Sequence, residues 1–169
     1  MLIKAKTIQL DTVQKAQLFD LTDAVKEFLA ESGVWNGIGV VSTLHTTTGV
    51  FYSEVQDALW DDITTFLHRL VAERAGYKHN DPRFSDCKRQ NAAAHLRAIL
   101  LGGSLALQVE AGSLVLGQFQ RIIFAELDGP RPRSVRIQFM GEGAAQQVTK
   151  PREWGDRGSV PLPCDGGLS

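Results

Sequence analysis

Three observations in the sequence predict one domain that contains both helices and strands. The 169 residues, 43% hydrophobic and 22% charged, suit a single domain with a substantial core. Apolar residues recur at helical spacing in three segments before residue 102. From Ser104 onward, short apolar runs separated by turn residues predict strands. No internal repeat divides the chain, so a second domain is not expected.

The composition limits the kinds of molecule that the protein is expected to bind. A formal net charge of -1 argues against general nucleic-acid or membrane-surface binding, because both depend mainly on positive charge. Cys87 and Cys164 stand far apart without a CxxC spacing, which is typical of a protein from a reducing cytoplasm. The first residues lack the apolar region of a secretory signal, and no apolar run approaches the length of a membrane span. We therefore expect a cytoplasmic protein whose partner is a small molecule.

The first third of the chain predicts a strand, a helix and a second strand. Residues 2–10 alternate loosely, as in a strand. Asp20 is a suitable N-cap for a helix that ends at Gly33, which fits the left-handed C-terminal position. The strand that begins at Val40 is β-branched and carries His45 near its end.

Glu54 follows His45 by nine positions, and this distance matters for any shared site. At about 3.3 Å per residue, an unbroken strand would separate the two side chains by roughly 30 Å. Either the chain turns sharply near Thr48-Gly49, or Glu54 serves a site that another subunit completes. We interpret His45 and Glu54 as belonging to two half-sites.

Two further helices are expected before residue 102. Ser53 followed by Gln56 resembles a capping box and predicts a helix from Glu54 to about Ala75. The third helix spans Ala92–Leu101, with Asn91 as a plausible N-cap. The apolar residues expected to face the core are Leu59, Ile63, Phe66, Leu67, Leu70 and Val71 on the second helix, and Leu96, Ile99 and Leu100 on the third.

Strands dominate the remainder up to residue 140. Residues 105–109 and 114–116 flank a hairpin turn, and residues 121–126 and 134–140 predict two more strands. The turn between these last two strands contains Arg131 and Arg133, which suit a bidentate anion such as phosphate, although a solvated hairpin tip is an equal alternative. Residues from Ala144 onward lose periodicity and predict an irregular tail in which Trp154 is an anchor.

Three histidines fall on three different predicted elements: His45 at a strand end, His79 in a polar loop and His95 near a helix start. Such a set is typical of an open catalytic metal site in which water is the fourth ligand. The alternative is that each histidine is structural, since no short metal motif such as HExxH is present. His68 shares a polar helix face with Asp57 and Asp61, and we interpret that face as solvated.

Several short motifs resemble those of the YjbQ-like family, in the same order along residues 1–142. The motifs are His45-Thr46-Thr47 with Glu54 (HTS/HTT…NE in the family), Tyr77-Lys78-His79-Asn80 (Y-x-H), Asn91–Leu96 (NAxAHL), Gly102–Leu105 (G-x-S-L), Gly117–Gln120 (G-T-W-Q) and Glu126–Arg131 (ELDGPR). The family is described as having secondary thiamine-phosphate synthase activity. This chain departs from the pattern at Ser53, Gln118 and Phe119, which concerns substrate contacts more than metal ligands.

The resemblance implies a compact α+β domain over residues 1–142, with a mostly antiparallel sheet and about three helices. Residues 143–169 have no counterpart in it and are expected to form an irregular C-terminal tail. It also implies a homotrimer with sites close to subunit interfaces, and metal ligation by His45, His79 and His95. Three imidazoles favour Zn²⁺ over Mg²⁺, which prefers oxygen ligands.

The family reaction would join a pyrimidine diphosphate to a thiazole phosphate and release pyrophosphate. For this chemistry we expect Glu54 and Glu126 as catalytic groups. The expected substrate and phosphate contacts are Arg131, Arg133, Asn91 and Gln120. Two alternatives stay open: a metal-dependent hydrolase of a small phosphorylated or carbonyl substrate, and a non-catalytic trimeric module in which a metal or small ligand is structural.

Overall fold

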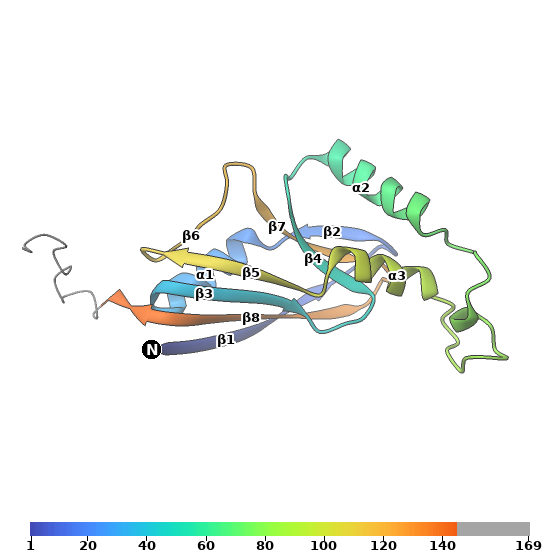
Figure 1. The fold of residues 1–169 in the computed structure, drawn as a ribbon, viewed down its shortest axis with the longest axis horizontal. Coiled ribbons are helices and arrows are strands. Elements are labelled where there is room, and N and C mark those ends of the chain that lie inside the picture. Colours follow the sequence, from blue (N-terminus) through green and yellow to red (C-terminus); the bar gives the residue numbers. More distant parts are fainter. Residues whose placement is uncertain (145–169) are drawn as a thin grey trace, which may run out of the picture.

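The computed structural model describes residues 1–144 as two antiparallel sheets with three α-helices (Figure 1). The strands are β1 (Leu2–Asp11), β2 (Gln17–Asp20), β3 (Val34–Thr43), β4 (Thr48–Ser53), β5 (Ser104–Glu110), β6 (Ser113–Leu114), β7 (Arg121–Glu126) and β8 (Pro132–Gly143). The helices are α1 (Thr22–Ser32), α2 (Asp57–Leu70), the short 3-10 helix η1 (Lys78–Asn80) and α3 (Ala92–Leu101). The α+β class with antiparallel sheets is therefore confirmed.

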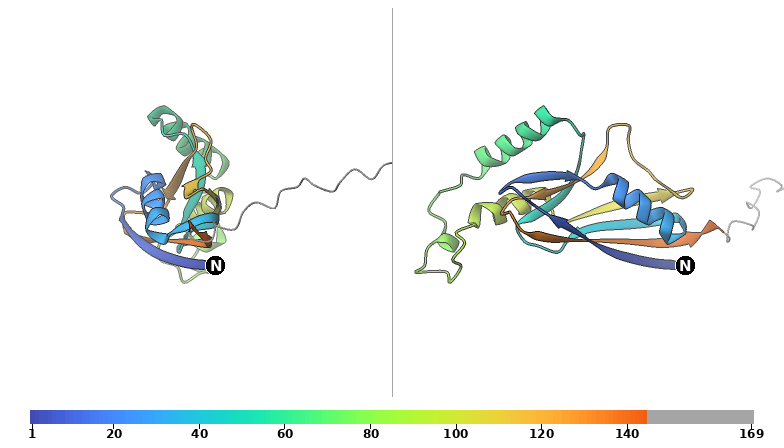
Figure 2. Two further views of the ribbon diagram at one scale, coloured as in Figure 1. Left: turned by 90° about the vertical axis from the view of Figure 1, so that its left-hand side faces the viewer. Right: turned by 180° about the vertical axis from the view of Figure 1, so that it is seen from behind.

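The two sheets have the strand orders β1-β8-β3-β5-β6 and β2-β7-β4. β8 alternates strictly, with Val135, Ile137 and Phe139 buried between more exposed residues, so one face of the larger sheet is apolar. β7 is instead a continuous buried run from Ile122 to Glu126, as expected for the central strand of the smaller sheet. The main core lies between these sheets and α1. Figure 2 shows α1 lying across the strands, whereas α2 stands at the other end of the molecule.

Both ends of α1 follow from local chemistry. Gly33 ends the helix in the left-handed conformation, at φ 70°, as its sequence position predicted. The Asp20 side chain accepts the backbone N–H of Thr22 at 2.8 Å, although Leu21 occupies the N-cap position. Strand β2, immediately before this helix, was not anticipated from the sequence.

The predicted second helix was wrong in its bounds and in its buried face. α2 covers only Asp57–Leu70, and its cap is Gln56, whose side chain accepts the N–H of Leu59 at 3.1 Å, rather than Ser53. Only Leu67 of the expected apolar stripe is fully buried, while Phe66 is 58% exposed. The helix therefore leaves much of its apolar surface uncovered in a single protomer.

The predicted core face of α3 was also wrong. Leu96, Ile99 and Leu100 are exposed, and the buried residues are instead Ala92, Ala93, Ala94, Arg97 and Ala98. A face made mainly of alanines lets the helix pack closely on β4. Gly49 of that strand makes the approach fit, since a Cβ there would lie 2.6 Å from Leu101 Cβ. Close packing through small residues, and not burial of leucines, fixes the position of α3.

The stretch from Val40 to Glu54 is two strands that belong to different sheets. β3 ends at Thr43, a turn covers residues 44–47, and β4 begins at Thr48 in the smaller sheet (Figure 1). The sharp turn expected near Thr48-Gly49 thus lies just before that pair. His45 is in the turn, and Glu54 follows the far end of β4, so the two residues flank opposite ends of one strand.

Two further predictions concerned membrane-spanning segments and the C-terminal tail. No helix within residues 1–144 is long and apolar enough to cross a membrane. β8 extends to Gly143, so the sheet includes the first residue of the predicted tail. The rest of that tail from residue 145, with Trp154, lies outside the described residues.

Candidate functional site

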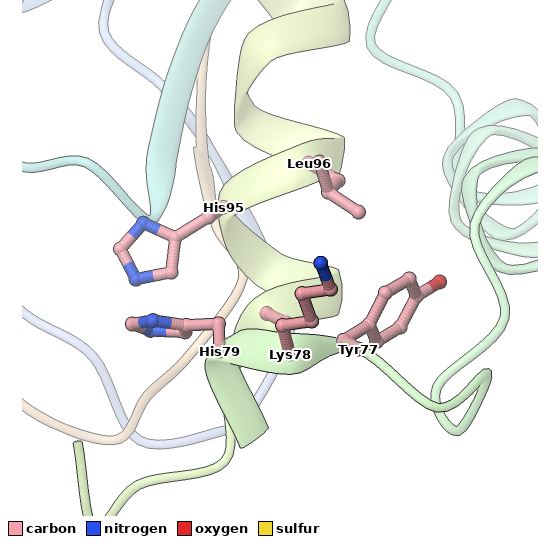
Figure 3. Close-up of a pocket in the computed structure, with 6 residues that line it drawn as sticks. Tyr77, Lys78, His79, His95 and Leu96 are labelled. Atoms are coloured by element: carbon pink, nitrogen blue, oxygen red, sulfur yellow. The ribbon is translucent and has the colours of Figure 1, made fainter. Parts of the chain in front are cut away.

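His79 and His95 form the centre of the candidate site. His79 projects from η1 toward α3, where its ring meets that of His95 edge to face, with a centroid separation of 5.0 Å (Figure 3). The pair lines a cavity of about 350 Å³ together with Tyr77, Lys78 and Leu96. His79 is exposed and His95 half-buried, so both imidazoles can be reached by a small ligand.

A second cavity, of about 420 Å³, is lined by His95 and by His45. Thr46, Thr48, Ala98 and Ile99 also contribute to its wall. His95 therefore lies between the two cavities, with His79 on one side and His45 on the other. The three histidines predicted as a set therefore line two cavities that share His95.

The His45 imidazole is held by a backbone group of β8. The N–H of Ser134 donates to His45 Nε2 at 2.8 Å, so this nitrogen is unprotonated and a neutral ring carries its proton on Nδ1. Burial lowers the pKa of His45, and the positive charge of Arg133 lowers it further, against the opposing effect of Glu126. The ring is therefore mainly neutral at pH 7, as a metal ligand must be.

The structure brings together two of the three histidines that were predicted as metal ligands. His79 and His95 are adjacent and open to solvent, whereas the lone pair of His45 Nε2 is occupied by the Ser134 N–H. Within residues 1–144, no group of three His, Cys, Asp or Glu side chains is placed to hold a metal ion. The arrangement thus offers an imidazole pair, and His45 would need to release Ser134 to join it.

Asn91 links this imidazole pair to a buried carboxylate. Its Nδ2 donates to Asp128 Oδ2 at 2.8 Å, and its Oδ1 lies 3.3 Å from His79 Nε2. Arg89 and Arg131 donate to the same oxygen of Asp128, each at 3.0 Å. Asn91, expected to bind substrate, therefore lies beside His79, and Arg131, expected to bind phosphate, is joined to Asn91 through Asp128. Arg131 is partly neutralised there by Asp128.

Glu126 and Arg133 are paired with each other inside the protein. Glu126 is fully buried and Arg133 is 2% exposed, and Arg133 donates to Glu126 Oε1 at 2.6 Å and to Thr47 Oγ1 at 3.0 Å. The same carboxylate accepts the backbone N–H groups of Leu127 and Asp128. These contacts hold the turn after β7 in place. The predicted catalytic role of Glu126 and phosphate-binding role of Arg133 stay predictions, for groups that a ligand does not reach in this arrangement.

Glu54 and Gln120 lie in other parts of the molecule. Glu54 is exposed between β4 and α2, where its carbonyl oxygen accepts the indole N–H of Trp60 at 3.1 Å. Gln120 is in the protruding loop between β6 and β7, and its side chain accepts the N–H of Gly117 at 2.8 Å (Figure 1). Neither residue lines the two cavities at His95. The structure therefore does not bring these two predicted site residues to the histidines.

Sequence reasoning missed two residues of the site, Lys78 and Asp128. Lys78 stands inside the Tyr77–Asn80 motif and brings the one cationic side chain among the residues lining the first cavity. Asp128 lies inside the Glu126–Arg131 motif, but only the fold shows that it reaches Asn91. The motifs that contain these two residues were recognised in the sequence, but their side chains were not predicted to belong to the site.

The fold and site define a small α+β protein with two antiparallel sheets and an open imidazole pocket on one face. Residues 6–142 match the model of a family described as UPF0047 protein YjbQ-like. The chain belongs to this YjbQ-like family, as its motifs indicated.

Relatives across bacteria and archaea support this membership. The chain is 39% identical over 140 residues to a UPF0047 protein of Methanothermobacter thermautotrophicus, covering 83% of this chain and 94% of the relative. It is 35% identical over 136 residues to the UPF0047 protein YugU of Bacillus subtilis, covering 80% and 98%. A crystal structure of a YjbQ-like protein of unknown function from Sulfolobus solfataricus superposes with a TM-score of 0.77 at 33% identity, covering 83% and 98%. A family member from Clostridium acetobutylicum gives 0.72 at 33% identity, covering 80% and 99%.

Proposed function

We propose that this protein is an enzyme that hydrolyses a small phosphorylated substrate at the His79–His95 pocket, with a divalent transition metal ion such as Zn²⁺ as cofactor. The adjacent, accessible pair of imidazoles carries this proposal. Imidazole ligands suit Zn²⁺ and related ions better than Mg²⁺. When bound, such an ion makes water a nucleophile at neutral pH.

The cavities favour water chemistry over a Mg²⁺-dependent transfer of a diphosphate. Within the described residues, the linings of both cavities at His95 include no carboxylate that could hold Mg²⁺. Lys78 supplies a positive charge for phosphate oxygens, and Leu96 provides an apolar wall. The volumes of about 350 and 420 Å³ lie in the range of small-molecule sites.

The proposed reaction is the hydrolysis of a phosphate ester. The oxygen of water bonds to phosphorus, the P–O bond to the leaving group breaks, and a proton from water passes to the departing alkoxide. In this reaction His79 and His95 would hold the cofactor, and Lys78 would stabilise the negative charge that develops on phosphate oxygens. Arg131 is a further cation, joined to Asn91 through Asp128.

Metal content and phosphatase activity test the proposal together. We expect His79→Ala or His95→Ala to lower zinc affinity by about tenfold or more and to remove hydrolysis of p-nitrophenyl phosphate. His68→Ala is the matched control, because this histidine is on α2 and lines neither cavity at His95. Unchanged zinc binding and hydrolysis in both site variants would overturn the proposal.

A thiamine-phosphate synthase-type transfer is the second candidate, supported by the family resemblance and by the cations Lys78 and Arg131. In that reaction the thiazole nitrogen bonds to the methylene carbon of the pyrimidine, and the C–O bond to diphosphate breaks to release pyrophosphate. Incubation with both substrates distinguishes the two, because thiamine phosphate forms only in the transfer. Retained zinc with neither activity would indicate a structural role for the metal.

We also propose that the protein works as a homotrimer in the cytoplasm. Apolar side chains exposed on α2 and α3, among them Phe66, Leu70, Ile99 and Leu100, support a partner surface on this side of the molecule. Cys87 forms no disulfide within residues 1–144, which agrees with a reducing compartment. Light scattering on the purified protein tests the assembly, and a monomeric mass at micromolar concentration would contradict it.

A further inference from the structure

Asp128 imposes an orientation on the side-chain amide of Asn91. The residue Asp128 is only 6% exposed, and its Oδ2 accepts from Arg89 Nε, from Arg131 and from Asn91 Nδ2. A carboxylate held between two guanidinium groups is an acceptor, so it can face only the NH₂ group of the amide. The carbonyl oxygen of Asn91 is therefore the end that points to His79.

This orientation selects one tautomer of His79. Asn91 Oδ1 lies 3.3 Å from His79 Nε2, and a carbonyl oxygen can only accept. Nε2 must then carry the proton, and a neutral ring keeps its lone pair on Nδ1. The thiol of Cys87, with its sulfur 3.7 Å from the same oxygen, is a further donor to it.

We infer that Asp128 and Asn91 are positioning residues that hold His79 as the Nε2–H tautomer and present its Nδ1 lone pair to a ligand. The use of this lone pair for a metal ion rests on the proposed function, but the tautomer does not. A histidine that binds a metal commonly donates its other N–H to a fixed acceptor. Here the acceptor is an amide, and the buried carboxylate behind it fixes which end of the amide is offered.

Capping of α3 does not account for the Asn91 side chain. Asn91 stands at the N-cap position of α3, yet its side chain makes no capping hydrogen bond. The N–H of Ala92 donates instead to Asn80 Oδ1 at 3.0 Å. Substitutions at Asn91 can therefore change the link to His79 without removing a helix cap.

Nitrogen NMR of the histidine side chains tests the inference in metal-free protein. At about pH 9, where free imidazole is neutral, we expect His79 to show a protonated Nε2 and an unprotonated Nδ1. Asn91→Leu keeps the size of the side chain but has no acceptor, so the Nε2 proton should exchange with water and the two ¹⁵N shifts should move toward each other. Arg69→Ala, at an exposed arginine of α2 outside this network, is the control and should leave the shifts unchanged.

Zinc titration separates this inference from the proposed function. We expect Asn91→Leu to weaken zinc binding by about 10–100-fold and Arg69→Ala, on the exposed face of α2, to leave it unchanged. A protonated Nδ1 in the wild-type protein, or unchanged His79 shifts in Asn91→Leu, would overturn the inference whatever the zinc result. If the tautomer is as stated and the wild-type protein binds no zinc, the positioning stands and the proposed function fails.

Discussion

The molecule contains two clusters of polar side chains that differ in what satisfies them. In the inner cluster, Glu126 and Arg133 are buried and bind each other, Thr47 and the backbone after β7. In the outer cluster, His79 and His95 touch each other and open onto a cavity. The inner side chains are hydrogen-bonded to protein groups, whereas the outer imidazoles line a cavity that a ligand can enter.

This difference separates a structural from a functional use of charged residues. Within residues 1–144, every buried side-chain nitrogen and oxygen has a hydrogen-bond partner, so the inner cluster has no vacancy for chemistry. His79 is instead on a connection between α2 and α3 that a few polar contacts attach to the body. Such a segment can adjust to a ligand, while His45 and His95 are positioned by the sheets and α3.

Breaking the inner pair should have the largest effect on stability. Arg133→Met leaves the Glu126 carboxylate buried without its cation, which typically costs about 3–5 kcal/mol. The free energy of unfolding from urea titration measures the loss. The double variant Glu126→Gln with Arg133→Met should recover part of it, because the uncompensated charge is gone. A cost below about 1 kcal/mol for the single variant would show that the pair is not the structural centre of this turn.

Overpacking between the two regions should have the next largest effect. An alanine at Gly49 places its Cβ 2.6 Å from Leu101 Cβ, so α3 must shift away from β4, at about 1–3 kcal/mol. Because α3 carries His95, zinc binding should weaken as well. Gly103→Ala is the matched control, since a Cβ there meets nothing within 4 Å. Equal unfolding energies and zinc affinities for the two variants would contradict this account of the helix position.

Acid should weaken the ion pairs that Glu73, in the segment after α2, makes with Lys15 and with Arg97 of α3. Its hydrogen bond from Lys15 lowers the pKa of Glu73, burial opposes this, and the charges of Lys15 and Arg97 lower it further. The folded protein therefore binds this proton less readily than the unfolded chain. The stabilisation is complete above the ordinary glutamate pKa of about 4.3 and is lost as the pH falls through the lowered value.

Comparison with Glu73→Gln measures this contribution. The wild type should be more stable than the variant by under about 1 kcal/mol at pH 6, because Glu73 is half exposed. The difference should vanish once the pH has fallen well below the lowered pKa of folded Glu73. A difference that persists there would exclude the carboxylate as its cause. Glu54→Gln, at an exposed carboxylate between β4 and α2, is the control.

The sequence predicted the class of fold and the segments of the site better than the faces of its helices. Alternation in β8 and the glycine after α1 are local patterns, and the structure agrees with both. The predictions of which faces of α2 and α3 are buried were wrong. Helical periodicity shows which residues lie on one face of a helix, but not whether another element of the protein covers that face. The pairing of Glu126 with Arg133 could not be predicted either, since it depends on how the strands on both sides of the turn are placed.

Removing an outer imidazole should change stability least and ligand binding most. His79 is exposed and its only hydrogen bond among the described residues is the 3.3 Å contact to Asn91, so His79→Ala should alter the unfolding energy by no more than about 0.5 kcal/mol. The same variant should lose zinc binding, whereas Arg133→Met should lose stability first. Urea and zinc titrations of both variants measure the effect of each cluster on stability and on ligand binding separately. If His79→Ala destabilised the protein as much as Arg133→Met, the outer cluster would be structural too, and the contrast between the two regions would fail.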